Sequence, residues 1–399
     1  MDALDISPLF SPFRVGGISL RNRFVVPSMQ RGVSEDGCPP PLLADYYRRF
    51  AEGGFALVMS EACAIDHPSA GQEGRIVRMT PATQPAWAPC IAKVRDAGAH
   101  MMIQLYHHGG MRKEGGADGA SSAPTISPSG LATASLPGGR AVTLEEMEEL
   151  KRSYARSAVL AREVGAAGVE LHAGHGFLLD QFLWAETNQR QDGYGGPDMA
   201  DRVKFPAEVV AAVREATGEE FVISLRFSQW KQLDYAAKVV ETPTDLEIML
   251  RALRAAGVDM FHVSTRSFNK PEWAGSDRAL AGWTKALTDA PVLTVGSIGA
   301  DRDLQSLYLD HQAGDDREMK SLTTASLDEL MRRFNLGEFD LVAVGRASIG
   351  DPDWVNKVAA GRFADIKLFQ REDLLNIIAS FNPQARRAQQ PDGVKFTPS

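Results

Sequence analysis

Short apolar runs recur along the chain, and amphipathic stretches separate them. The runs predict eight strands, at residues 24–28, 55–62, 100–106, 168–172, 221–228, 260–265, 292–297 and 341–346. Most of these runs are continuously apolar rather than alternating, which is typical of parallel strands that are covered on both faces. The pattern therefore favours a parallel sheet in which helices connect successive strands.

Helical periodicity falls between the predicted strands. It predicts helices at residues 41–52, 144–164, 201–217, 244–256 and 326–335. Thr143 precedes the second of these and is followed by Glu145 and Glu146, a good N-cap with an acidic first turn. The fourth stops just before Gly257, a residue suited to end a helix.

Eight strands alternating with helices predict one α/β domain, a (β/α)8 TIM barrel. The chain has 399 residues, well above the ~250 that this fold usually needs, so loop insertions are expected. Candidate insertions follow the third, sixth and seventh strands, at residues 109–140, 267–281 and 307–323. We assign residues 1–380 to the barrel and 381–399 to a polar C-terminal tail that is a candidate contact in a homo-oligomer.

Composition and charge narrow the class of protein. Lys and Arg number 43 and Asp and Glu 51, a net charge of −8 that disfavours nucleic acid as a partner. No apolar run approaches the roughly 20 residues of a membrane helix, and the first five residues carry two acids rather than a secretory signal. Three scattered cysteines are too few for a disulfide framework or a four-cysteine cluster. We expect a cytoplasmic protein that acts on a small molecule.

In such barrels the chemistry lies where the strands end, at their carboxyl side. The polar or turn-forming residues that fall there are Ser28, Met29, Gln30, Glu61, Ala62, Gln104, Tyr106, His172, His175, Arg226, Ser264, Thr265, Arg266, Gly296, Ser297, Gly345 and Arg346. This set suits a planar, hydrogen-bonding cofactor that carries a phosphate.

The last two strand ends are candidates for the phosphate. Gly296 and Ser297 follow the seventh strand, and Gly345 and Arg346 follow the eighth. Glycine lets backbone amides approach a phosphate closely, and an arginine can clamp it with two hydrogen bonds. The alternative is that these residues only form tight turns.

The stretch from Val169 to Leu183 carries a pair of histidines. An apolar strand ends at His172, and Gly174 and Gly176 allow His175 to turn back toward the same cavity. Two imidazole donors at one point can hold a carbonyl, carboxylate or phenolate oxygen. A metal site and a purely structural role are the alternatives; no third metal ligand is evident, because Asp180 is expected to face the following helix.

These motifs resemble the old yellow enzyme family of FMN-dependent oxidoreductases, over about residues 9–357. The segments that carry the resemblance are Asn-Arg-Phe-Val-Val-Pro-Ser-Met at 22–29, Gln-Leu-Tyr-His at 104–107, His-x-x-His with Leu-Leu-Asp-Gln-Phe-Leu at 172–183, Asn-Gln-Arg-Gln-Asp-Gly-Tyr-Gly-Gly at 188–196, Arg226, and Val-Gly-Arg at 344–346. Each segment is modest alone, but they occur in order with one in nearly every βα unit.

The resemblance implies FMN as cofactor and ping-pong hydride transfer from NADH or NADPH, through FMN, to an activated C=C bond. It implies contacts with the flavin ring from Pro27, Ser28, Met29, Gln30, Ala62, Gln104 and Arg226, and with the phosphate from Gly296, Ser297, Gly345 and Arg346. It further implies that His172 and His175 bind the substrate oxygen.

Two residues depart from the family pattern. Phe177 stands where the family usually has a tyrosine that donates a proton to the substrate α-carbon, and a phenyl ring has no exchangeable proton. Tyr106 is the nearest candidate donor, with water as an alternative. Gln30 stands where threonine or cysteine is common, which is expected to alter the flavin potential.

The missing donor keeps other functions open. Oxidation of an N-methyl amine needs no α-carbon protonation, and the loop at 267–277, with Phe268, Trp273 and Asp277, is a candidate aromatic and acidic wall for a cation. Trp273 is thus a candidate substrate contact alongside Phe177. A flavin-binding scaffold without catalysis is the non-enzyme alternative, although a scaffold needs neither the histidine pair nor Arg226.

Overall fold

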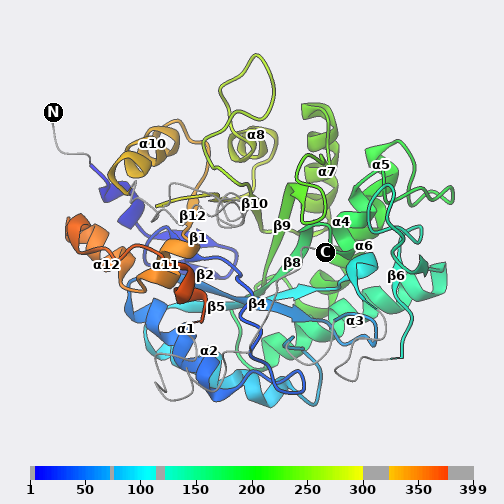
Figure 1. The fold of residues 1–399 in the computed structure, drawn as a ribbon, viewed down its shortest axis with the longest axis horizontal. Coiled ribbons are helices and arrows are strands. Elements are labelled where there is room, and N and C mark those ends of the chain that lie inside the picture. Colours follow the sequence, from blue (N-terminus) through cyan, green and yellow to red (C-terminus); the bar gives the residue numbers. More distant parts are fainter. Residues whose placement is uncertain (1–4, 72–75, 114–121, 300–322, 376–399) are drawn as a thin grey trace.

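The computed structural model describes residues 5–71, 76–113, 122–299 and 323–375. Eight parallel strands close into a barrel in the order β10-β11-β12-β3-β4-β5-β8-β9, with helices around them (Figure 1). Their bounds are β3 (Phe24–Val26), β4 (Leu57–Ala64), β5 (His100–Tyr106), β8 (Gly168–His175), β9 (Val222–Lys231), β10 (Met260–Ser264), β11 (Val292–Val295) and β12 (Leu341–Ala343). The prediction of a (β/α)8 barrel is confirmed.

Several strand ends differ from the sequence prediction. β3, β11 and β12 are two or three residues shorter at the carboxyl end, whereas β8 and β9 continue to His175 and Lys231. At β11 the chain turns at Gly296, whose φ is +155°, a conformation that ends regular pairing. The position at which each strand ends is therefore set by the direction in which the next loop leaves the barrel. The pattern of hydrophobic residues does not encode that direction.

A β-hairpin that the sequence analysis did not predict closes the opposite mouth of the barrel. It consists of β1 (Phe13–Val15) and β2 (Ile18–Leu20), which pair antiparallel. Buried residues of this hairpin cluster with inward side chains at the amino ends of the strands, including Leu57, Met102 and Met260. With one mouth plugged by apolar packing, the carboxyl mouth is left for binding.

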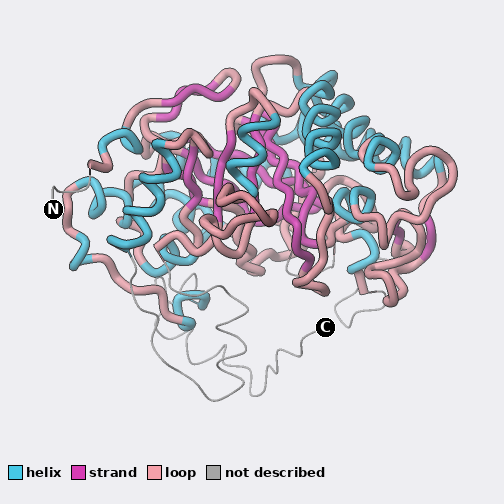
Figure 2. The backbone as a smooth tube through the Cα atoms, turned by 90° about the horizontal axis from the view of Figure 1, so that it is seen from above, coloured by secondary structure: helices cyan, strands magenta, loops and turns pink. Residues whose placement is uncertain are grey.

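Helices surround the strands, as seen from above in Figure 2. Their bounds are α1 (Pro41–Glu52), α2 (Gln84–Asp96), α3 (Leu144–Glu163), α4 (Leu178–Leu183), α5 (Met199–Arg202), α6 (Lys204–Thr217), α7 (Pro243–Ala256), α8 (Leu280–Leu287), α10 (Thr323–Asn335), α11 (Arg346–Gly350) and α12 (Trp354–Ala359). In the parts of the chain described, none of these helices is long and apolar enough to span a bilayer.

The helices largely follow the sequence prediction. Thr143 and Glu146 form a capping box at the start of α3, and α7 ends at Gly257 as expected. The single helix expected at 201–217 is instead two, α5 and α6. The reason is Pro206, which lacks an N–H and is tolerated only in the first turn of a helix, so a new helix starts at Lys204.

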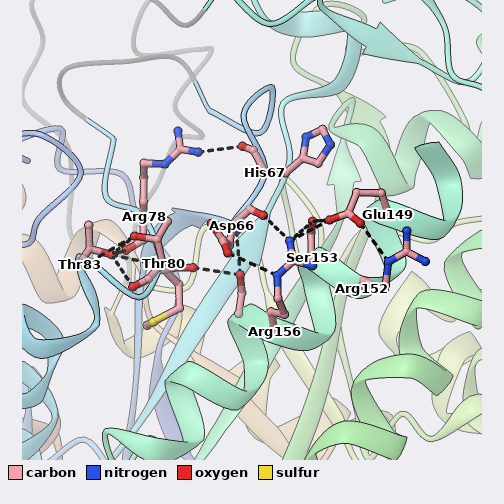
Figure 3. A network of polar contacts seen from close by, with 11 residues as sticks. Asp66, His67, Arg78, Thr80, Thr83, Glu149, Arg152, Ser153 and Arg156 are labelled. Atoms are coloured by element: carbon pink, nitrogen blue, oxygen red, sulfur yellow. Dashed lines mark hydrogen bonds and ion pairs between the residues drawn. The ribbon is translucent and has the colours of Figure 1, made fainter. Parts of the chain in front are cut away.

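The long loops at the rim are tied to the barrel by polar contacts. Asp66 and His67 follow β4, and Figure 3 shows Asp66 against Arg156 of α3. Arg78 donates a 2.8 Å hydrogen bond to the carbonyl of His67, which closes this loop on itself.

Within the expected insertion at 109–140, the short strands β6 (Ile126–Ser127) and β7 (Arg140–Ala141) pair in parallel. The insertion expected at 307–323 and the tail at 381–399 lie outside the described residues, apart from Thr323.

Candidate active site

The two histidines of the sequence motif lie together at the carboxyl mouth. The pairing of β8 with β9 is irregular between Ala173 and His175, and His175 has a φ of +63°. This turn brings the His175 ring to 4.9 Å from the His172 ring, with 3.3 Å between Nδ1 of His175 and Nε2 of His172. His175 therefore lies beside His172, as the sequence analysis expected.

Both histidines are uncharged hydrogen-bonding groups. Burial, followed by the positive charge of Arg226, holds the pKa of each imidazole well below its usual range. Nε2 of His175 lies 2.9 Å from the hydroxyl of Ser264, whereas Nδ1 of His172 is buried without a hydrogen bond among the described residues. That nitrogen is available to a ligand.

Ser264 links His175 to Arg226. The Arg226 guanidinium donates to the Ser264 hydroxyl at 3.2 Å and to the carbonyl of Ser28 at 3.0 Å. Nε of Arg226 is buried and has no partner in the described part of the chain. Ser264 lies on the rim predicted from the sequence. The sequence analysis gave it no role in the site, because a lone serine does not indicate that it bridges two other residues.

Gln104 is held in one orientation from two sides. Its carbonyl oxygen accepts a 2.8 Å hydrogen bond from Ser28, and its amide nitrogen donates at 2.7 Å to Glu170. Ala62 is its register partner on the neighbouring strand β4. The predicted ring contacts Ser28, Ala62, Gln104 and Arg226 are therefore brought together.

Glu170 is the buried carboxylate that accepts the hydrogen bond from Gln104. It also accepts from Ser224 at 3.1 Å and lies 2.7 Å from Nδ1 of His262. Burial alone would raise the pKa of Glu170, but His262, Arg226 and the hydrogen bonds lower it to about 2. The carboxylate thus stays charged and fixes the amide of Gln104.

Gln30 meets a second buried acid. Its side-chain amide donates to Oε2 of Glu61 at 2.6 Å, and the same oxygen accepts from the backbone N–H groups of Arg31 and Gly32 at 3.1 Å each. Burial raises the pKa of Glu61 to about 7, and these hydrogen bonds oppose the rise. Glu61 therefore determines where Gln30 and its loop lie, a role that the sequence does not reveal.

Pro27 and Met29 line the seam where β3 meets β12. A Cβ built on Gly345 would lie 3.7 Å from both side chains, at ordinary contact distance. Met29 also packs against Ile349 and Phe369. The first and last strands of the barrel thus bring predicted ring contacts next to a predicted phosphate contact.

The two candidate phosphate turns lie side by side. A Cβ on Gly296 would come within 2.6 Å of the Thr265 hydroxyl, so only glycine fits there, and Gly299 lies against Ala347 of α11. Ser297 has a φ of +51° and its hydroxyl donates to the carbonyl of Arg266 at 2.8 Å. Gly345 immediately precedes Arg346, the first residue of α11.

Aromatic side chains form the rest of the wall around the histidines. Trp230 lies 4.3 Å from the His175 ring and stacks on Tyr235 at 5.3 Å. Trp230 was missed because β9 extends beyond its predicted end. Trp273 donates to the carbonyl of Glu241 and packs on Trp283, and none of its described contacts reaches the histidines.

The expectation for Asp180 is wrong. Its carboxylate does not face the following helix but pairs with Lys231 of β9 at 2.7 Å, with both side chains almost fully buried. It also accepts a 2.6 Å hydrogen bond from the backbone N–H of Gly176. The cause is the parallel pairing of β8 with β9, whose register places Lys231 opposite His175.

Comparison with known proteins agrees with this geometry. Residues 8–313 match the model of the NADH:flavin oxidoreductase / NADH oxidase family. The chain belongs to this family. The resemblance to old yellow enzymes is confirmed, and FMN is the cofactor.

Individual relatives are moderately similar. An NADH oxidase from Thermoanaerobacter brockii is 31% identical over 373 residues, covering 90% of this chain and 52% of that protein. The chain therefore spans about half the length of this relative. Chanoclavine-I aldehyde reductase from Penicillium roqueforti is 31% identical over 64% of this chain and 68% of its own. The old yellow enzyme homologue from Zymomonas mobilis superposes with a TM-score of 0.72 at 22% identity, covering 92% of this chain and 96% of that chain.

The residues at the mouth fit FMN. Within the described ranges, Nε of Arg226 is buried without a hydrogen-bond partner, and Gln104 presents a fixed amide that has further hydrogen-bonding capacity. Gly296 is buried, and any side chain at this position would clash with Thr265 and Phe268. Hydrogen-bonding groups of this kind are what a flavin ring requires.

Glu61→Gln is expected to remove a pH dependence of stability. The folded protein holds a proton on Glu61 up to a pKa of about 7, against 4.5 for an ordinary glutamate. The stabilisation is therefore present below pH 4.5 and is lost as the pH rises through 7. Between pH 5 and 8, the free energy of unfolding of wild type should fall by roughly 2–3 kcal/mol relative to the variant.

Urea unfolding of both proteins at the two pH values measures this difference. Glu215→Gln, at an exposed position on α6, is the matched control and should follow wild type. A Glu61→Gln curve that runs parallel to wild type from pH 5 to 8 would contradict the prediction.

Proposed function

We propose that this protein is an FMN-dependent NAD(P)H oxidoreductase that reduces the C=C bond of an α,β-unsaturated carbonyl compound. The supporting observation is the pair of neutral imidazoles, His172 and His175, at the barrel mouth beside a buried Arg226. FMN, when bound and reduced by the nicotinamide, supplies the hydride chemistry that no side chain of the protein can supply.

The histidine pair would bind and polarise the substrate oxygen. A carbonyl that accepts hydrogen bonds from imidazole draws electrons away from the conjugated C=C bond, which makes the β-carbon electrophilic. Because both rings are uncharged and buried, they contribute directed donors in a site of low dielectric constant. Ser264 would keep His175 oriented by bonding its other nitrogen.

The remaining site residues would hold the cofactor. Arg226 would place positive charge beside the pyrimidine end of the ring, where Gln104 would also bond. The ring contacts that we propose are Pro27, Ser28, Met29, Gln30, Ala62, Gln104 and Arg226, and the phosphate contacts are Gly296, Ser297, Gly345 and Arg346. Phe177 would lie against the substrate.

The relatives support a reductive direction, since one of them is an aldehyde reductase and another an NADH oxidase by name. The amine-oxidising alternative was based on Phe177 in place of a tyrosine donor, with the loop at 267–277 as a candidate cation wall. The described contacts of Trp273 engage it with Glu241 and Trp283 instead. A cytoplasmic location and a homo-oligomer remain predictions from the sequence.

The purified protein is expected to be yellow and to bleach near ~450 nm when NADH or NADPH is added without oxygen. Addition of 2-cyclohexenone should then restore the colour. A yellow protein that neither nicotinamide bleaches would favour the scaffold alternative, and bleaching by a methylated amine alone would favour amine oxidation. A colourless protein that does not bind added FMN in calorimetry would refute the proposal.

A further inference from the structure

Reduction of a C=C bond requires a proton as well as a hydride, and the structure holds a hydrogen-bonded phenol and imidazole close to the histidine pair. Hydride addition at the β-carbon leaves the α-carbon to be protonated. Phe177, which follows the histidine pair, carries no exchangeable proton. If the protein supplies the proton, another side chain must do so.

Phe177 is surrounded by three rings. Its centroid lies 4.7 Å from that of His172, 5.2 Å from that of Tyr106 and 5.5 Å from that of His108. The hydroxyl of Tyr106 in turn lies 3.1 Å from Nδ1 of His108. A phenol and an imidazole are thus hydrogen-bonded to each other against the phenyl ring that borders the substrate clamp.

The surroundings of this pair keep the phenol protonated and the imidazole neutral. Tyr106 is almost fully buried, and burial raises the pKa of its hydroxyl above the ordinary value of 10. Burial and then the charge of Arg112 lower the pKa of His108 to about 4. At neutral pH, His108 can therefore accept a proton at one ring nitrogen while it gives up the proton at the other.

We propose that Tyr106 is the proton donor to the substrate α-carbon and that His108 returns a proton to it. This inference rests on the proposed function. In the transfer, the O–H bond of Tyr106 breaks and a C–H bond forms at the α-carbon. The phenolate regains a proton from Nδ1 of His108, whose Nε2 takes one from water. The hydroxide passes to solvent, and both residues end neutral, with the proton of His108 on Nε2. His108 is partly exposed, which gives the relay access to solvent.

The two residues come from one short segment, which explains how the pair arises. Tyr106 is the last residue of β5, and His108 follows two positions later, just before the turn Gly109–Met111. His107, between them, is turned away: its ring accepts from the N–H of Gly109 at 2.9 Å and contacts Ser69. The turn therefore points His108, rather than His107, back to the phenol.

Tyr106→Phe separates the proton step from the rest of the reaction. With 2-cyclohexenone as acceptor, we expect the rate of flavin reoxidation to fall about 10²-fold, the usual loss when a general acid is removed. With menadione, a quinone whose protons end on oxygen and exchange with water, the rate should stay within twofold of wild type. Bleaching by NADH or NADPH should also be unchanged.

Two further variants test the relay. Tyr106→Phe combined with Phe177→Tyr returns a phenol to the same corner and should recover at least tenfold of the lost enone rate. His108→Asn keeps the phenol but interrupts its link to water, so the solvent isotope effect on enone reduction should rise while the menadione rate holds. Tyr154→Phe, which removes a buried tyrosine hydroxyl on α3, is the matched control and should resemble wild type.

The outcomes distinguish this inference from the proposed function. If wild type reduces neither acceptor after bleaching, the proposed function fails and the inference fails with it. If wild type reduces 2-cyclohexenone and Tyr106→Phe does so within twofold of it, the inference is overturned while the proposed function stands. If the Tyr106→Phe variant does not bind FMN, its enone rate cannot be measured. The His108→Asn variant then decides, and a solvent isotope effect equal to that of wild type would overturn the relay.

Discussion

His172→Ala and His175→Ala are each expected to lower kcat/KM for a cyclic enone by about 10²–10³-fold, as when one donor to a developing oxyanion is lost. The reason is the placement of the pair: both rings are buried, neutral and within hydrogen-bonding distance of each other. Removing one leaves a single donor for the substrate oxygen in a site that water enters poorly. Stopped-flow reoxidation of the reduced flavin by 2-cyclohexenone measures the effect.

Phenol binding gives an independent measure of the same pair. A phenol bound over the flavin produces a long-wavelength absorbance, which both variants should lose while they keep the flavin itself. His100→Ala is the matched control, because His100 begins β5 at the opposite end of the barrel and its ring bonds the carbonyl of Ser19. Phenol affinities unchanged from wild type in both clamp variants would refute the assignment of these histidines.

Disrupting the buried ion pair is expected to have the largest effect on stability. Asp180→Asn or Lys231→Met would each leave the other partner charged and buried, which typically costs about 3–5 kcal/mol of unfolding free energy. The two side chains are 0% and 1% exposed and 2.7 Å apart, so little water can compensate for the lost partner. Equilibrium unfolding in urea, monitored by tryptophan fluorescence, measures the loss.

The double variant shows whether the lost stability comes from a buried unpaired charge or from the loss of the contact itself. Asp180→Asn with Lys231→Met leaves no buried charge at this position, so it should recover more than half of the stability lost by either single variant. Lys204→Met, which breaks the exposed pair with Asp201, is the control and should cost less than about 1 kcal/mol. Single variants at Asp180 and Lys231 that cost no more than this control would contradict the prediction.

Because Asp180 also holds the N–H of Gly176, the same substitutions would disturb the turn that follows His175. Lys231 is the register partner of His175 on β9, so the ion pair lies directly behind the clamp. Stability and clamp geometry are thus coupled through two residues that the sequence analysis did not assign to the site.

The sequence predicted the barrel well because apolar runs report directly on burial. The run at 100–106 became β5 without change, and the helix beginning after Thr143 formed with the expected cap. Helix α2 escaped prediction because it contains Pro89 in its interior and Pro85 as its second residue, which weakens its helical signal. The hairpin that plugs the barrel was missed because each of its short strands has a polar middle residue and so forms no continuous apolar run.

The amino-acid sequence alone determined the alternation of strands and helices, the residues at the rim, the histidine pair and the family to which the chain belongs. These depend on local periodicity and on motifs of a few residues, which a linear sequence contains in full. Only the tertiary structure decided that Ser264 joins Arg226 to His175, that Glu61 holds Gln30, that Lys231 neutralises Asp180 and that His108 meets Tyr106. Three of these four contacts join residues from different βα units, so their partners are fixed by the register of the closed barrel. The fourth depends on how a loop turns after β5, which the residue types at 106–108 do not specify.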